Sequence, residues 1–215
     1  MKEYGGWKFP DHEVHLLGWL RKVNEKVDGR LRYQGKKIDA SMAACRNFRT
    51  AIDVGAHIGL WSYYLARKFE HVHSFEPVEE HRQCFEENMV TCSNVTVYPV
   101  ALGDVNDHVS IFTANTSSGD SWVNGPGDIP RMRLDDLEFA DVDFIKIDCE
   151  GSELLVLRGA EALILRDRPT ICVEQKPGRA QKFGLPETGA VDYLRGLGAE
   201  MKASLSGDYV FAFPE

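Results

Sequence analysis

The apolar positions from residue 50 onward alternate between short strand-like runs and segments with a helical pattern. The strand-like runs are rich in β-branched and aromatic residues and cover residues 50–55, 71–77, 94–102, 142–148 and 169–175. Segments with helical composition or spacing follow most of them, over residues 58–69, 78–90, 151–164 and 187–198. Because the runs are apolar on both faces, the pattern predicts an α/β fold, a parallel sheet with helices packed on each side.

Three segments depart from this alternation. Residues 11–28 place apolar side chains at helical spacing, which predicts a helix near the N-terminus. Residues 104–134 are rich in Gly, Asn, Ser and Asp, which predicts an insert with one or two extra strands. The runs 199–205 and 208–213 flank Ser206-Gly207, which predicts an antiparallel hairpin at the end of the chain.

The composition indicates one globular domain with an acidic body. The chain has 215 residues, of which 43% are hydrophobic and 27% are charged, and this is enough to bury a sizeable core. Residues 1–50 carry 11 Lys and Arg against 6 Asp and Glu, whereas residues 51–215 carry 14 against 27. The body would therefore repel a polyanion, which makes nucleic acid an unfavourable partner.

The sequence also bears on location. No run approaches the roughly 20 apolar residues of a membrane-spanning helix, and the first residues show no signal-peptide pattern. The five cysteines form no CxxC pair, so we expect them to be reduced and structural. The expectation is a soluble, cytoplasmic protein without a membrane partner.

The ends of the predicted strands carry the most informative residues, because ligands of parallel α/β sheets bind outside the carboxyl ends of the strands. The first strand runs into Asp53-Val54-Gly55-Ala56-His57-Ile58-Gly59. Gly55 suits a tight turn, and Gly59 lets the following helix approach the sheet. The spacing lacks the second glycine of the G-x-G-x-x-G dinucleotide fingerprint, which disfavours a pyrophosphate. An acidic residue such as Asp53 suits a cationic ligand instead, for example a sulfonium or an ammonium group.

Glu76 ends the second strand, 21 residues after Gly55. A carboxylate at this place can accept hydrogen bonds from both ribose hydroxyls of an adenosine ligand. Taken alone, Glu76 could equally be a solvated carboxylate at a strand end. Behind the Asp-x-Gly-x-x-x-Gly turn, the ribose-binding role is favoured.

Several motifs together resemble those of the FkbM-type methyltransferases. They are IDVGAHIGLWS, SFEP, the pattern N-V-x-x-x-P-V-A-L-G-D, RLDDL and DFIKIDCEGSELLVLRGA, in the family's order and spacing. The resemblance implies an S-adenosylmethionine-dependent enzyme of the Rossmann-like class I fold. That fold is a three-layer α/β/α sandwich with a seven-stranded, mostly parallel sheet and a C-terminal antiparallel hairpin. A methyltransferase domain would then cover residues 50–215, and residues 1–49 would form an N-terminal helical lid or cap.

The resemblance also implies which positions bind the cofactor. The methionine moiety would be lined by Gly55, Ala56, His57 and Gly59, with Asp53 at the strand end before them. Glu76 would hold the ribose, and the adenine would be flanked by Pro77, Ala101 and Leu102. Asp148 would face the amino group and the reacting methyl group.

Three charged residues at the end of the fourth strand, Lys146, Asp148 and Glu150, are the candidate catalytic residues. Methyl transfer needs an acceptor atom positioned at the methyl carbon, and an alcohol acceptor must also lose a proton to a base. Lys146 could instead form a structural ion pair with Glu174 on the neighbouring strand. The carboxylates of Asp148, Glu150 and Glu174 could converge on a divalent cation, but we predict no metal.

The N-terminal aromatic residues and the histidines carry weaker signals. Trp7 and His12 could contribute to an acceptor site, or their segment could simply pack against the body. His81 and His108 have the sequence surroundings of surface residues.

The favoured function is O-methylation of a hydroxyl group of a small molecule or a saccharide. The alternative is a nucleic-acid methyltransferase that acts on the ribose 2′-hydroxyl. Its Lys-Asp-Lys-Glu set could be imitated by Lys36 or Lys37, Asp148, Lys176, and Glu174 or Glu200. The acidic body argues against this alternative, because nucleic-acid binding usually needs a basic face. A third possibility, a binding module without catalysis, is opposed by the intact strand-end residues.

Overall fold

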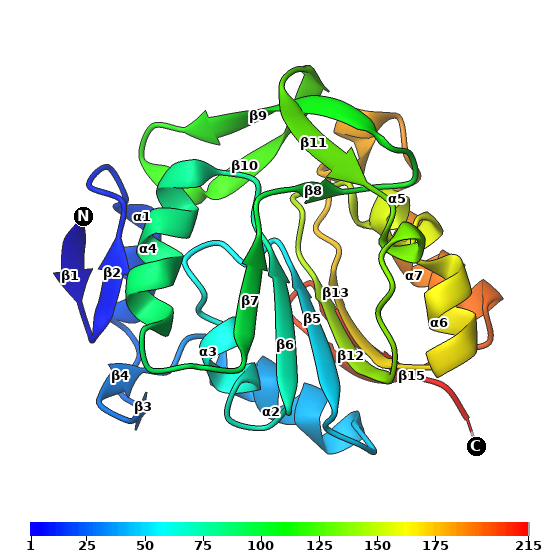
Figure 1. Cartoon of the computed structure of the whole chain (residues 1–215), viewed down its shortest axis with the longest axis horizontal. Coiled ribbons are helices and arrows are strands. Elements are labelled where there is room, and N and C mark those ends of the chain that lie inside the picture. The colour runs from blue at the N-terminus through cyan, green and yellow to red at the C-terminus, as the bar shows by residue number, and fades with distance from the viewer. Residues whose placement is uncertain (215) are drawn as a thin grey trace.

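The computed structural model describes residues 1–214 and centres on a seven-stranded sheet (Figure 1). Its strands are β5 (Thr50–Val54), β6 (His71–Phe75), β7 (Val95–Tyr98), β12 (Val142–Ile147), β13 (Thr170–Glu174), β14 (Glu200–Leu205) and β15 (Asp208–Ala212). They lie in the order β7-β6-β5-β12-β13-β15-β14. All neighbours are parallel except β15, which is antiparallel to both of its neighbours. The predicted mostly parallel sheet with a terminal hairpin is confirmed.

Helices cover both faces of this sheet (Figure 1). One face carries α2 (Gly35–Ala44), α3 (Ser62–Leu65) and α4 (Glu79–Met89), and the other carries α5 (Glu153–Arg158), α6 (Glu161–Asp167) and α7 (Gly189–Gly196). Successive strand residues point to opposite faces. Ala51 and Phe144 therefore belong to the first core, and Ile52 and Ile145 belong to the second. The three-layer α/β/α arrangement is confirmed.

Several elements are shorter than the sequence pattern predicts. The segment 151–164 breaks into α5 and α6 at Gly159, where a side chain would collide with the carbonyl oxygen of Gly103. The run 94–102 splits into β7 and β8 (Ala101–Leu102), because Pro99 has no amide proton to continue the ladder. Within residues 1–214, none of the helices is both long and apolar enough to cross a membrane.

The N-terminal segment is a mixture of short strands and helices. It contains β1 (Lys2–Tyr4), β2 (Trp7–Phe9), α1 (His15–Leu20), β3 (Lys26–Val27) and β4 (Arg30–Leu31) before α2. The predicted helix over 11–28 is therefore wrong in its extent. Asp28 and Gly29 both have positive φ angles, 49° and 82°, which close the tight turn between β3 and β4. Val14 and Trp19 are exposed, whereas Leu20 is fully buried and Leu17 and Val23 pack against the core, so the apolar spacing marks the buried face only in part.

The insert contains more strands than the one or two predicted. Its strands β9 (Asp107–Ala114), β10 (Ser117–Pro126) and β11 (Ile129–Met132) form a second sheet with β8, in the order β10-β9-β11-β8. Two 3-10 helices, Leu134–Asp136 and Ala180–Phe183, complete the chain's helical elements in the described part. Figure 1 shows the second sheet above the carboxyl ends of β5, β6 and β7, where the predicted site lies.

Candidate active site

A cleft of about 610 Å³ lies where the strand ends meet the insert. We call β8, the ends of β5, β6 and β12 and the turns after these three strands the floor, and strands β9 and β10 the roof. The floor contributes eight of the predicted residues: Gly55, His57, Glu76, Pro77, Ala101, Leu102, Asp148 and Glu150. The roof adds residues that no motif indicated: Ile111, Ser118, Gly119, Ser121, Trp122 and Val123. Apolar side chains combined with a few carboxylates suit an organic ligand that carries polar groups.

The turn after β5 brings backbone groups to the floor. Gly55 has a φ of 76°, and a side chain there would collide with the Asp148 carbonyl oxygen, so only glycine fits between the two strand ends. The amides of Gly55 and Ala56 donate hydrogen bonds of 3.0 and 3.1 Å to the Phe75 carbonyl. His57 also has a left-handed conformation, with φ 52°, and its side chain lines the cleft.

Three of the predicted cofactor residues, Asp53, Ala56 and Gly59, lie outside the cleft lining. Asp53 is fully buried, and its Oδ2 accepts a hydrogen bond of 2.6 Å from the Ser62 hydroxyl. Gly59 faces α4, where an added Cβ would lie 2.7 Å from the Met89 methyl carbon. These residues lie behind the turn and not in the cleft lining, and a contact between them and the cofactor stays a prediction.

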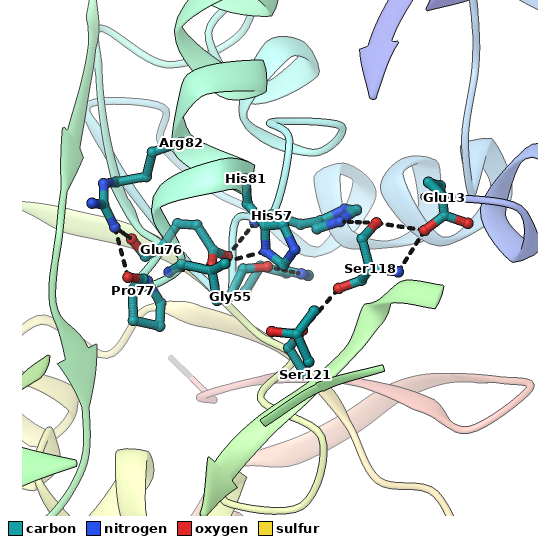
Figure 2. Close-up of polar contacts among 12 residues, drawn as sticks. Glu13, Gly55, His57, Glu76, Pro77, His81, Arg82, Ser118 and Ser121 are labelled. Atoms are coloured by element: carbon teal, nitrogen blue, oxygen red, sulfur yellow. Dashed lines mark hydrogen bonds and ion pairs between the residues drawn. The ribbon is translucent and has the colours of Figure 1, made fainter. Parts of the chain in front are cut away.

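Glu76 is fixed in one orientation at the end of β6 (Figure 2). Its Oε2 accepts a hydrogen bond of 2.8 Å from the His57 amide, and its Oε1 accepts from the Val78 amide at 2.9 Å and from His81 Nδ1 at 3.1 Å. A carboxylate offers about four acceptor positions on its two oxygens. Glu76, which is 5% exposed, thus retains acceptor capacity on Oε2 for a donor in the cleft.

The prediction that His81 lies at the surface is wrong. His81 is 1% exposed, lines the cleft, and its ring centroid lies 4.5 Å from that of His57. Burial and the neighbouring His81 hold the pKa of His57 well below its usual range, so His57 is neutral at physiological pH. The charged residues at the start of α4 made His81 resemble a surface residue. The one sequence feature that points to the site is its position five residues after Glu76.

Ser118 joins the floor, the roof and the N-terminal segment (Figure 2). Its hydroxyl lies 2.7 Å from His57 Nε2 and donates to Glu13, and its amide donates to Glu13 Oε2 at 2.6 Å. Glu13 is fully buried, and its Oε1 accepts from the Leu16 amide at 2.5 Å. Since the serine proton goes to the carboxylate, the network assigns the His57 proton to Nε2.

Lys146 lies beneath the floor and not in the cleft lining. Its Nζ is 3.5 Å from Asp148 Oδ2, 3.7 Å from Asp53 Oδ1 and 3.3 Å from the Gly55 carbonyl oxygen. Burial opposes its charge, but Asp148 and Asp53 outweigh burial and raise the pKa of Lys146. The predicted ion pair between Lys146 and Glu174 is wrong, because Glu174 pairs with Lys176 at 2.7 Å.

The carboxylates of Asp148, Glu150 and Glu174 do come together, with oxygens within 4.8 Å of one another. Burial and the charge of Asp148 raise the pKa of Glu150 to about 7 and that of Glu174 to about 9. Burial also opposes the charge of Asp148, but Lys146 and Lys176 lower its pKa. Each carboxylate already has a protein cation beside it, since Arg179 Nε lies 3.1 Å from Glu150 Oε2.

The acceptor-site role considered for Trp7 and His12 does not match their positions. Trp7 is fully buried, donates its indole proton to the Leu31 carbonyl at 2.8 Å and packs against Tyr63. His12 Nδ1 lies 3.4 Å from a carboxylate oxygen of Glu80, outside the cleft lining. The packing alternative is confirmed for Trp7.

The comparisons with known proteins agree with this architecture. The sequence profile of the family described as "Methyltransferase FkbM domain" matches residues 53–201, more than half of the chain. The chain belongs to the FkbM methyltransferase family. The resemblance noted in the motifs is thereby confirmed, and S-adenosylmethionine is the cofactor that goes with this family. No curated protein matches the chain.

Solved structures extend the likeness to the wider FkbM and class I fold. A methyltransferase FkbM from Methylobacillus flagellatus KT is 22% identical, with a TM-score of 0.53 over 78% of this chain and 44% of that one, so the chain spans less than half of its length. An rRNA methylase from Streptococcus thermophilus is 11% identical, with a TM-score of 0.52 and coverages of 83% and 95%. SMU.1697c from Streptococcus mutans, described as a methyltransferase and solved with SAH, is 9% identical, with a TM-score of 0.52 and coverages of 82% and 93%. At these identities the likeness shows the fold.

Proposed function

We propose that the chain is an S-adenosylmethionine-dependent O-methyltransferase that acts on a hydroxyl group of a small molecule or a saccharide. The observation that carries this proposal is that Asp148 and Glu150 line the same cleft as Gly55, His57 and Glu76. Two carboxylates with different pKa values in one cleft can serve two purposes, holding a cation and accepting a proton. An alcohol acceptor requires the second of these.

The floor fits the cofactor in its chemistry. The tight turn at Gly55, which lines the cleft, and the neutral His57 suit the methionine moiety. Glu76 has acceptor capacity left for a ribose hydroxyl. The adenine ring needs apolar contacts, and Pro77, Ala101 and Leu102 supply them beside the roof.

The two carboxylates that follow β12, Asp148 and Glu150, have different roles in this proposal. Asp148, whose pKa is lowered by Lys146 and Lys176 against the effect of burial, stays charged and suits the cofactor's amino group and sulfonium. Glu150, with a pKa raised to about 7, is poised near neutral pH, which is the best value for a general base. Lys146 is a positioning residue, because it holds Asp148 and the Gly55 carbonyl in place from beneath the floor.

The cofactor supplies a methyl group on a sulfonium, which an acceptor oxygen attacks in line. When bound, the cofactor would supply a methyl carbon that bonds to the acceptor oxygen as its bond to sulfur breaks, with the electron pair of the broken bond left on sulfur. Glu150 accepts the hydroxyl proton of the acceptor. Between the floor and the roof, the acceptor oxygen and the methyl carbon would be held within about 3 Å of each other, and this positioning can supply much of the rate acceleration of such a displacement.

Methylation of a ribose 2′-hydroxyl in RNA is the second candidate. Lys37 and Lys176 both act on the ionisation of Asp148, as a Lys-Asp-Lys set would. However, Lys37 is paired with Asp208, and Lys176 with Glu174. Glu200 belongs to no such group, because it is exposed and pairs with Lys202. Together with the acidic body, these pairings favour the small-molecule or saccharide acceptor.

The test is a screen for release of S-adenosylhomocysteine with three sets of acceptors: glycans, small hydroxylated metabolites and RNA. We expect turnover with a hydroxylated metabolite or a glycan, and its loss in Glu150→Gln. Lys202→Met serves as the control, because Lys202 is exposed, pairs with Glu200 and does not line the cleft. Turnover with RNA alone would replace this proposal with the second candidate.

A further inference from the structure

The turn that carries Glu150 is strained and firmly held. Glu150 has a φ of 52°, a left-handed conformation that costs a non-glycine residue free energy, and it is 8% exposed. The Glu153 carboxylate accepts hydrogen bonds from the amides of Cys149 at 3.0 Å and Gly151 at 2.9 Å. These two hydrogen bonds fix the backbone on both sides of Glu150, so the Glu150 side chain has little freedom to turn away from the cleft.

A second loop presses against this turn. An added Cβ at Gly151, where φ is 120°, would collide with the carbonyl group of Arg179 in the segment after β13. The Arg179 side chain returns to the same turn, with Nε 3.1 Å from Glu150 Oε2. Its Nη2 donates a hydrogen bond of 2.7 Å to Asp120 Oδ1 on β10. One planar guanidinium therefore joins the floor, the loop after β13 and the roof.

We infer that Arg179 is a positioning residue that keeps Glu150 in its proton-accepting form, and that Asp120 holds Arg179 in place when the roof covers the cleft. This inference rests on the proposed function of Glu150 as the base. Arginine suits the role because it remains charged at all relevant pH values and its fork can meet two carboxylates at once. When the roof covers the cleft, Asp120 would thus also help to keep Glu150 able to accept a proton.

The charges that face Glu150 come from four segments. Asp148 on the same turn and Asp120 on the roof disfavour its charged form, as does Glu174 at the end of β13 when ionised. Lys176 and Arg179 from the following loop favour it. Only the two cations favour the charged form of Glu150 in this group, whereas the carboxylates and burial oppose it. The loss of either cation therefore moves Glu150 toward its neutral form.

Asp120 separates a positioning effect from a simple electrostatic one. As a negative charge, it acts directly on Glu150 and raises the pKa of that carboxyl. As the partner of Arg179, it holds the guanidinium where that group lowers the same pKa. If positioning dominates, removal of Asp120 moves the Glu150 titration to higher pH; if only the direct charge acts, removal moves it to lower pH.

The experiment is a titration of the full chain labelled with ¹³C at the glutamate carboxyl carbons, followed by NMR. The Glu150 signal is assigned as the one that disappears in Glu150→Gln. We expect Arg179→Met to reduce the acid dissociation constant of Glu150 by about tenfold or more, and Arg179→Lys by less, because lysine keeps a charge but not the fork. Asp120→Ala should shift the titration in the same direction as Arg179→Met.

Lys202→Met, at an exposed lysine paired with Glu200, is the control and should leave the titration unchanged, and circular dichroism confirms that each variant is folded. An unmoved titration in Arg179→Met, or a shift to lower pH in Asp120→Ala, overturns the inference. The titration needs no acceptor, so its result is independent of the proposed function. A normal Arg179 effect with full turnover by Glu150→Gln would remove Glu150 as the base while leaving the role of Arg179 intact.

Discussion

The floor and the roof of the cleft are built in different ways. Floor residues such as Gly55, Glu76 and Asp148 stand at the ends of parallel strands, where the backbone ladder sets their positions. The roof residue Ser118 depends on partners far away in the sequence, since Glu13 lies 105 residues from it. The difference indicates that the strand ladder positions the floor, whereas side-chain contacts with the N-terminal segment position the roof.

The largest effect should come from the floor carboxylate that we assign as base. Glu150→Gln should reduce kcat by about 10²–10⁴ at saturating cofactor, because an amide cannot accept the acceptor's proton. In the unchanged protein, kcat should rise with pH through about 7, since Glu150 must lose its own proton before it can act. Both are measured as S-adenosylhomocysteine release against pH.

Asp148→Asn provides the contrast within the floor. We expect it to weaken cofactor binding as well as turnover. If Glu150 is the base, kcat should still rise with pH, but at lower pH than in the unchanged protein, because the charge of Asp148 no longer raises the pKa of Glu150. Full turnover by Glu150→Gln together with loss of the pH-dependent rise in Asp148→Asn would reverse the two assignments.

The next largest effect concerns the support beneath the floor. Lys146→Met should lower the free energy of unfolding by about 3–5 kcal/mol, because it leaves the charges of Asp53 and Asp148 buried without their shared cation. Denaturant-induced unfolding measures this loss. Lys202→Met, which removes an exposed lysine paired with Glu200, should cost less than about 0.5 kcal/mol. Equal losses in the two variants would contradict the supporting role.

Removal of the ribose carboxylate should affect binding more than folding. Glu76→Ala is expected to weaken binding of S-adenosylhomocysteine by about 1.5–3 kcal/mol, the range for hydrogen bonds to a charged group. Titration calorimetry measures the change. Glu79→Ala, three residues further on and exposed, is the control and should bind normally. An unchanged dissociation constant in Glu76→Ala would show that the ribose lies elsewhere.

The roof should give the smallest effect on cofactor affinity. Ser118→Ala removes the link between His57 and Glu13 but no expected ligand contact, so the loss should be about 1 kcal/mol or less. Ser110→Ala, on the neighbouring strand β9 and bonded to the Asn124 carbonyl, should have no effect. A loss as large as that of Glu76→Ala would mean that the roof binds the cofactor directly.

Much of the fold and floor could be predicted from the sequence because their signals are local. Strand ends such as Asp148 follow directly from apolar runs, and the turn at Gly55 follows from a glycine that only such a turn requires. The alternation of strands and helices also predicts that the sheet is mostly parallel. The sequence pattern therefore suffices to predict that Gly55, Glu76 and Asp148 lie in one cleft.

The remainder depended on contacts that no pattern contains. His81 lies among charged residues in the sequence, and in the structure it is buried beside Glu76, whose Oε1 accepts a hydrogen bond from its ring. Ser118, in a polar stretch without periodicity, acquires its place from the buried Glu13. Lys146 has two possible carboxylate neighbours on adjacent strands. The strand register decides between them, because it sets Lys146 opposite Asp53 on β5 but opposite Cys172 on β13.

The close approach of Gly159 to Gly103 has a consequence for how this chain can diversify. β11 returns beside β8 in parallel, and the Gly103 amide donates a hydrogen bond of 3.0 Å to the Met132 carbonyl, so the insert leaves and re-enters the body at one point. The packing at Gly159 anchors that point to the helical layer. An exchange of residues 105–128 for a segment from another relative, with both glycines kept, should therefore preserve the strand ends beneath it. Asp120 lies inside the exchanged segment and is the partner of Arg179, so it is the one further residue that such an exchange must keep to leave the surroundings of Glu150 unchanged.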